Sequence, residues 1–112
     1  MAKRQVSPRE VIYRYVRLLE KKIHVDQVIL FGSTSMEKIG VNSDIDLVVL
    51  SNDFKKMNFL KRLEFLSCTR GRKCISVAMD IIGYTKEEFS RLSKESMILS
   101  EVKRNGQVVW SR

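Results

Sequence analysis

Two aspartates at the start of an apolar strand limit most strongly what this chain can fold into. Asp44 and Asp46 lie two positions apart in residues 44–50, a segment that is otherwise apolar and rich in β-branched residues. Side chains alternate between the faces of a strand, so both carboxylates leave the same face, about 7 Å apart along the backbone. Converging carboxylates repel each other and are costly to bury uncompensated. The chain must therefore supply a counter-charge at this end of the strand.

A divalent cation is the natural counter-charge, because Mg²⁺ takes hard oxygen ligands and is commonly held by carboxylates together with substrate phosphates. Two such ions can activate an attacking oxygen and stabilise the leaving oxygen of a displacement at phosphorus, chemistry that calls for at least three carboxylates. Asp80 is the best third candidate, since it lies in the apolar segment 77–82, where a charge is out of place unless paired or metal-bound. We therefore predict Asp44, Asp46 and Asp80 as metal ligands and catalytic residues.

Gly32 and Ser33 end a short apolar run, residues 28–31, that is typical of a buried strand. Glycine lets the backbone approach a phosphate closely, and serine offers a hydroxyl and an N–H. These are the groups needed to hold the β- and γ-phosphates of a nucleoside triphosphate. Taken singly, a Gly-Ser step is usually just a turn, and an Asp-x-Asp pair usually lies on the surface or in a calcium-like loop. Their joint occurrence in this order favours a phosphate-handling site.

The remaining pattern predicts a small sheet covered by helices. Start and stop signals and apolar spacing place the elements along the chain. We expect helices at residues 8–22 and 54–68, strands at 28–31, 44–50 and 75–82, one or two short helices opening with the capping box at 85–88 and ending near Asn105-Gly106, and an edge strand or hydrophobic tail at 108–110. In the second helix, the expected buried residues are Phe54, Met57, Leu60, Leu63 and Leu66.

Length and composition set the class of protein. The chain of 112 residues suits one domain, residues 1–112, and is too short for two. No apolar run approaches the ~20 residues needed to cross a bilayer, and the N-terminus lacks a signal-peptide pattern, so we expect a cytoplasmic protein with no membrane partner. Cys68 and Cys74, with one histidine, are too few ligands for zinc and are expected to be reduced structural residues. The net charge of +8 indicates either a polyanionic partner or simply a solvated basic surface.

The motifs resemble the signature of the DNA polymerase β-like nucleotidyltransferase superfamily. The matching segments are LFGS at residues 30–33 and NSDIDLVV at residues 42–49, with a step of eleven residues from Ser33 to Asp44. The similarity extends over nearly the whole chain and is closest to the minimal nucleotidyltransferase domains of bacteria and archaea, the antitoxin type included. The resemblance implies an α+β fold, a small mixed and mostly antiparallel β-sheet flanked by α-helices.

The resemblance also implies an activity, the transfer of a nucleoside monophosphate, AMP from ATP, to a hydroxyl on a protein or nucleic acid. Gly32 and Ser33 match the positions that hold nucleotide phosphates. Asp44 and Asp46 match the two metal ligands, and Asp80 the third acidic residue. Two Mg²⁺ ions and ATP or another nucleoside triphosphate are therefore expected. Members of this subgroup often act with a helical HEPN-type protein, as the antitoxin of a toxin–antitoxin pair; association into a homo-oligomer stays open.

The sequence departs from the family pattern shortly after the Gly-Ser turn. Many members carry a small residue, an arginine and a glycine there, whereas this chain has Ser35, Met36 and Glu37. The missing arginine removes a phosphate or acceptor contact, which Lys38 would replace in part. Two alternatives therefore stand beside the enzyme: a catalytically weak binding module that neutralises a helical partner, and, because of the charge, a basic RNA-binding protein.

Overall fold

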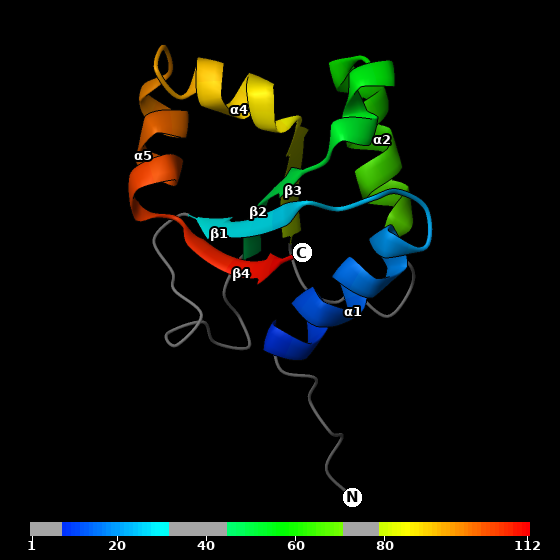
Figure 1. Ribbon diagram of the computed structural model, residues 1–112. Coiled ribbons are helices and arrows are strands. Elements are labelled where there is room, and N and C mark those ends of the chain that lie inside the picture. The colour runs from blue at the N-terminus through cyan, green and yellow to red at the C-terminus, as the bar shows by residue number, and fades with distance from the viewer. Residues whose placement is uncertain (1–7, 32–44, 71–78) are drawn as a thin grey trace, which may run out of the picture.

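A computed structural model describes residues 8–31, 45–70 and 79–112 (Figure 1). Their elements in chain order are α1 (Pro8–Glu20), β1 (Gln27–Phe31), β2 (Ile45–Leu50), the 3-10 helix η1 (Asn52–Lys56), α2 (Phe59–Thr69), β3 (Met79–Tyr84), α4 (Lys86–Leu92), α5 (Met97–Asn105) and β4 (Gln107–Ser111). The strands form one sheet in the order β3-β2-β1-β4. β1 runs antiparallel to β2 and to β4, whereas β2 and β3 are parallel. The expected α+β fold with a mixed, mostly antiparallel sheet is confirmed.

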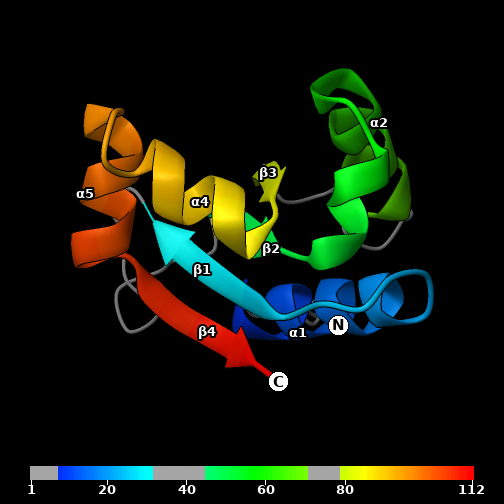
Figure 2. The same cartoon turned by 45° about the horizontal axis from the view of Figure 1, so that its top comes forward.

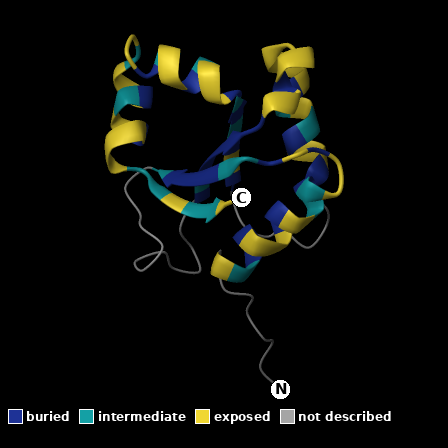
Figure 3. Ribbon diagram, in the orientation of Figure 1, coloured by how far each residue is buried: buried dark blue, intermediate teal, exposed yellow. Residues whose placement is uncertain are grey.

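The sheet is apolar on both faces, and a different set of helices covers each. Val28 and Leu30 of β1 and Leu47 of β2 lie in a cluster with residues of α1, η1 and α2. The alternate positions, among them Ile29 and Val48, lie in a second cluster with residues of α4 and α5. Figure 2 shows α1 on one side of β1 and the α4–α5 pair on the other. In Figure 3 the strands are largely buried between helices whose outer faces are exposed. The sheet is thus the middle layer of three.

The first helix packs as the sequence predicts. Its apolar stripe is buried against the sheet, and Tyr15 is fully buried. The Tyr15 hydroxyl donates a 2.8 Å hydrogen bond to the Leu66 carbonyl of α2, so the polar end of the ring is satisfied inside the core. This contact joins the two helices that cover the same face of the sheet.

The helix expected at residues 54–68 is wrong in its start and at one of its five expected buried residues, Leu60. The chain first forms η1, which buries Phe54, and α2 begins only after Asn58, whose side chain accepts a hydrogen bond from the Lys61 N–H. Leu66 is fully buried, as expected, and Met57 and Leu63 are half-buried. Leu60, expected to be buried, is 65% exposed, and Arg62, only 7% exposed, takes the inward position instead.

Arg62 joins four segments through its guanidinium group. Its Nε donates to the carbonyls of Phe54 (3.1 Å) and Met57 (3.0 Å), and Nη2 donates to Phe54 as well (2.7 Å). Nη1 donates to the Gly83 carbonyl at the end of β3 (3.2 Å). Both terminal nitrogens also pair with the Glu88 carboxylate of α4, at 2.6 and 2.9 Å. A buried charge is tolerated when it is paired and its donors are satisfied, as they are here.

Glu88 has a second role, which ties this ion pair to the start of α4. Its carboxylate accepts from the Thr85 N–H (2.9 Å), while the Thr85 hydroxyl accepts from the Glu88 N–H (3.0 Å). This is the capping box predicted from residues 85–88, and it is confirmed. Hydrogen bonds from Arg62 lower the pKa of the Glu88 carboxyl below its usual range; partial burial opposes the shift and the Thr85 N–H adds to it.

The other expected elements are confirmed within the described residues. Two helices, α4 and α5, follow the capping box, and α5 ends at Asn105 with Gly106 as its C-cap. A Cβ at Gly106 would lie 2.4 Å from the Val102 carbonyl oxygen, so only glycine fits between α5 and β4. The segment 108–110 is part of the edge strand β4. Cys68 is exposed and reduced, and Cys74 lies outside the described residues. None of the described helices has the length and hydropathy to cross a membrane.

Replacing Arg62 by methionine tests the buried ion pair. The variant removes the charge but keeps the apolar stem, so the Glu88 carboxylate and three carbonyls lose the donors that Arg62 supplies. We expect the free energy of unfolding at pH 7 to fall by about 3 kcal/mol, measured by urea denaturation. Lys61→Met, on the neighbouring exposed position, is the matched control and should change it little.

The same variant has a pH signature with a definite sign. Because the folded-state pKa of Glu88 is lowered, its contribution is complete above the usual glutamate pKa of about 4.3 and is lost as the pH falls through the folded value. Wild type should therefore lose more stability than Arg62→Met between about pH 5 and pH 3. Parallel curves for the two proteins would contradict the assignment.

Candidate active site

Asp46 and Asp80 lie side by side on neighbouring strands. In the parallel pairing of β2 with β3, Asp46 is the register partner of Asp80. In the antiparallel pairing of β1 with β2, Asp46 is also the partner of Phe31. Neighbouring strands lie about 4.8 Å apart, so Phe31, Asp46 and Asp80 form one row across the sheet. This carboxylate row crosses the end of the sheet where β1 finishes and β2 and β3 begin.

The alternation of side chains decides which face carries the row. The flanking residues Ile45, Leu47, Met79 and Ile81 point into the core beneath α1 and α2. Positions between them must point the opposite way, so both carboxylates lie on the α4–α5 face. Because the two strands are parallel and in register, the two acidic side chains leave this face together. The structure thus brings together two of the three acidic residues predicted from the sequence.

The other predicted residues of the site cannot be placed. Gly32, Ser33 and Asp44 lie outside the described residues. Within residues 8–31, 45–70 and 79–112, no three His, Cys, Asp or Glu side chains gather in a way that would hold a metal ion. The roles of all five residues therefore stay predictions.

Asp80 is not buried, contrary to the expectation from the sequence. We expected a carboxylate buried in an apolar strand, but Asp80 is exposed, because the inward positions of β3 alternate with outward ones and β3 is an edge of the sheet. Burial therefore does not demand a counter-ion for it. The register with Asp46 is the stronger argument, since like charges directly opposite each other on a sheet are unfavourable unless a cation separates them.

A polar cavity of about 210 Å³ adjoins Asp80 at the outer edge of β3. Ser67 and Arg70 line it from α2, together with Asp80 itself. Arg70 is the C-cap residue of α2, directly after the last helical residue, Thr69. Residues of α2 and of β3 thus line one cavity at the edge of the sheet, although the Asp80 side chain leaves β3 on the α4–α5 face. No local sequence signal connects Arg70 with Asp80, because the two residues belong to different elements.

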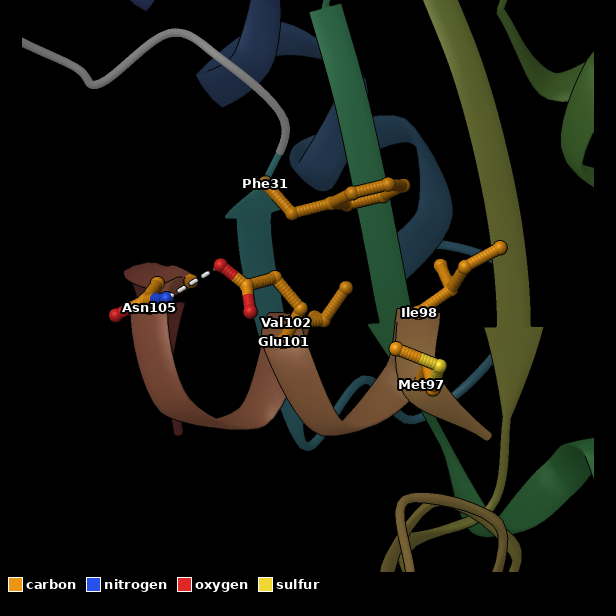
Figure 4. Close-up of a pocket in the computed structure, with 7 residues that line it drawn as sticks. Phe31, Met97, Ile98, Glu101, Val102 and Asn105 are labelled. Atoms are coloured by element: carbon orange, nitrogen blue, oxygen red, sulfur yellow. Dashed lines mark hydrogen bonds between the residues drawn. The ribbon is translucent and has the colours of Figure 1, made fainter. Parts of the chain in front are cut away.

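A larger cavity of about 570 Å³ begins at the other end of the row. Phe31 lines it together with Met97, Ile98 and Val102 of α5. In Figure 4 the Phe31 side chain extends from β1 across β2, with α5 beside it. We assigned α5 no functional residue from the sequence. The sequence does contain a sign of this surface. Leu99 and Val102 are three residues apart and form the buried stripe of the helix, whereas the adjacent apolar residues Met97 and Ile98 fall outside that stripe.

The family of the chain follows from its match to the sequence model of a protein family. The model described as Polymerase beta, Nucleotidyltransferase matches residues 15–112. This chain belongs to the polymerase β nucleotidyltransferase family. The match extends over both strands of the carboxylate pair and over α5. Among curated protein sequences, none matches the chain closely enough to count as a relative.

Two solved structures share the nucleotidyltransferase fold with this chain. The first is a candidate nucleotidyltransferase from Sulfolobus solfataricus, with 20% sequence identity and a TM-score of 0.64, over 93% of this chain and 80% of that one. The second is a toxin–antitoxin structure with AMP-PNP, with 22% identity and a TM-score of 0.57, over 94% of this chain and 74% of the other. At such identities the likeness establishes the fold alone.

Removing one charge of the carboxylate row should stabilise the metal-free nucleotidyltransferase. Asp80→Asn keeps the shape but ends the repulsion from Asp46, so at low salt we expect a gain of about 0.5 kcal/mol in the free energy of unfolding. The gain should shrink in high salt, which screens exposed charges. Urea denaturation at two salt concentrations measures both effects. Glu64→Gln, exposed on α2, is the control, and an unchanged or lower stability of Asp80→Asn would contradict the pairing.

Proposed function

We propose that this protein transfers a nucleoside monophosphate, AMP from ATP, to a hydroxyl group of a protein or nucleic acid. The observation that carries the proposal is the in-register pair Asp46 and Asp80 on an open end of the sheet. Membership of the nucleotidyltransferase family supports the reaction class. Gly32 and Ser33 are proposed to hold the phosphates, and Asp44 to complete the set of carboxylates.

The donor set fits Mg²⁺. Carboxylate oxygens are the hard ligands that this ion prefers, and substrate phosphates usually complete its coordination. Asp46 and Asp80 supply such oxygens from rigid strands, with Asp44 as the third proposed ligand. Divalent ions bound to these residues would supply positive charge beside the attacking and leaving oxygens.

The residues of the chain account for the remaining requirements of the transfer. The new bond joins the acceptor oxygen to the α-phosphorus, and the bond to the departing pyrophosphate breaks. Asp80 is exposed, so it can reach an acceptor hydroxyl and take its proton. Arg70 lines the same cavity as Asp80 and offers a guanidinium to phosphate oxygens. Asp46 is less exposed and is better placed as a ligand than as a base.

The partner we propose is a helical protein of the HEPN type, with this chain as the antitoxin. The similar structure described as a toxin–antitoxin with AMP-PNP supports a protein partner for this fold. A hydroxyl on that partner would then be the acceptor. Transfer of a nucleotide to the partner would add a charged group and so block its activity.

Transfer of label from ATP tests the enzyme directly. Incubation of the protein with α-³²P-labelled ATP, Mg²⁺ and the helical partner should label the partner, measured by gel autoradiography. Asp46→Asn and Asp80→Asn should each lower the rate at least about 100-fold, because the metal site loses a charged ligand. Chelation of divalent ions should abolish transfer in wild type.

Glu64→Gln again serves as the matched control and should transfer at the wild-type rate, since this residue is exposed on α2 outside the row. If the partner is neutralised equally well by wild type and by Asp46→Asn, without label, the protein is the catalytically weak binding module instead. Full activity of both aspartate variants would remove the catalytic assignment.

A second candidate, RNA binding, is favoured by the outer side of α1. Arg9, Tyr13 and Arg17 are exposed and follow each other at steps of four residues, so they share one side of the helix, and the exposed Lys21 follows just after the helix ends. Basic residues on one face are the footprint of a polyanion. This candidate predicts RNA affinity that falls steeply between 50 and 200 mM salt, roughly 10³-fold for six phosphate contacts. Affinity that does not depend on salt, measured by fluorescence anisotropy, would exclude it.

A further inference from the structure

We propose that the cavity between Phe31 and α5 receives the nucleobase of the nucleoside triphosphate whose phosphates lie at Asp46 and Asp80. The proposal rests on the proposed function, because it needs a nucleotide at the carboxylate row. The site would then have two parts. The carboxylate row binds the phosphates, and the cavity between Phe31 and α5, here called the base cavity, binds the base.

The base cavity is continuous with the carboxylate row. Phe31 lines the cavity and is also the register partner of Asp46. Both side chains lie on the α4–α5 face, since β1 and β2 alternate in the same sense at this pair. Phe31, which lines the cavity, thus lies one strand away from Asp46, where the phosphates are proposed to bind. Its volume of about 570 Å³ is in the range of small-molecule sites.

The lining suits a flat aromatic ring with polar edges. Phe31, Met97 and Ile98 supply apolar and aromatic surface, on which any base can stack. Glu101 and Asn105 supply a polar side, and the Asn105 amide donates a 2.6 Å hydrogen bond to the Glu101 carboxylate (Figure 4). An apolar protein side chain would use only the first set of contacts. A nucleobase uses both.

The charge distribution fixes the direction of the nucleotide. The Glu101 carboxylate repels phosphates, so the α5 end of the cavity disfavours the triphosphate. The base therefore points toward α5, and the phosphates point away from Glu101, toward the carboxylate row.

Met97 and Ile98 are exposed far beyond what packing requires. They are 90% and 71% exposed, whereas Leu99 and Val102 already anchor α5 to the sheet. Large apolar side chains gathered at a cavity mark a surface that something covers. Because they add little to the core, they can be changed without unfolding the protein, which makes the proposal testable.

The test compares ATP with inorganic triphosphate, both with Mg²⁺, by isothermal titration calorimetry. Wild type should bind ATP about tenfold more tightly than triphosphate, because only ATP carries a base to stack. Met97→Gln combined with Ile98→Asn should remove most of this difference and leave the affinity for triphosphate unchanged. Leu60→Asn, at an exposed leucine on α2, is the matched control and should behave as wild type.

The outcomes separate this inference from the proposed function. Equal affinities for ATP and triphosphate in wild type, or an unchanged preference in the Met97/Ile98 double variant, would overturn the base cavity while leaving the carboxylate site intact. Failure of wild type to bind either ligand would remove the proposed function and, with it, the inference. Weaker binding of both ligands by the double variant, with an unchanged ratio, would also count against the base cavity.

Discussion

The ion pair between Arg62 and Glu88 fixes the part of the fold on which the site depends. β2 and β3 are parallel, so the chain must cross from one end of the sheet to the other between them, and it does so through η1 and α2. With one guanidinium, Arg62 binds the carbonyls at the end of η1, a carbonyl near the end of β3 and a carboxylate in the first turn of α4. A side chain with fewer donors could not satisfy these groups at once.

The register of β3 matters because a slip of one residue would reverse its faces. Asp80 would then point toward the core beneath α1 and α2, and Met79 or Ile81 would take its place beside Asp46. Two features oppose such a slip. Gly83 lies where a Cβ would be 2.8 Å from the Phe54 ring, so no other residue of β3 fits there. The Arg62 hydrogen bond to the Gly83 carbonyl also holds this position. The geometry of the candidate site is thus a consequence of packing at the opposite end of the strand.

The sequence was sufficient for what depends on local pattern, and insufficient where a distant partner decides. The capping box at Thr85 and Glu88 and the stop at Gly106 need only neighbouring residues, and both were predicted correctly. The inward position of Arg62 could not be predicted, because its partners Gly83 and Glu88 lie more than twenty residues away in the chain. Without them, an apolar residue such as Leu60 is the better candidate for burial. Likewise, the row of Phe31, Asp46 and Asp80 depends on strand registers that no local signal sets.

One face of the sheet carries most of the apolar core, and the other carries the candidate site. The face beneath α1 and α2 carries the larger apolar cluster. The residues of the row are not part of this cluster, but their neighbours along the strands are. The α4–α5 face has a smaller cluster, which includes Val48 and Leu50 of β2 and has Phe31 of the row packed against it. Beside this cluster lie two carboxylates in register, Asp46 and Asp80, and the exposed apolar start of α5. Such a combination is unfavourable for an isolated protein. The proposed metal-bound nucleotide would make it favourable, because it would bring cations to the carboxylates and a flat apolar base to α5.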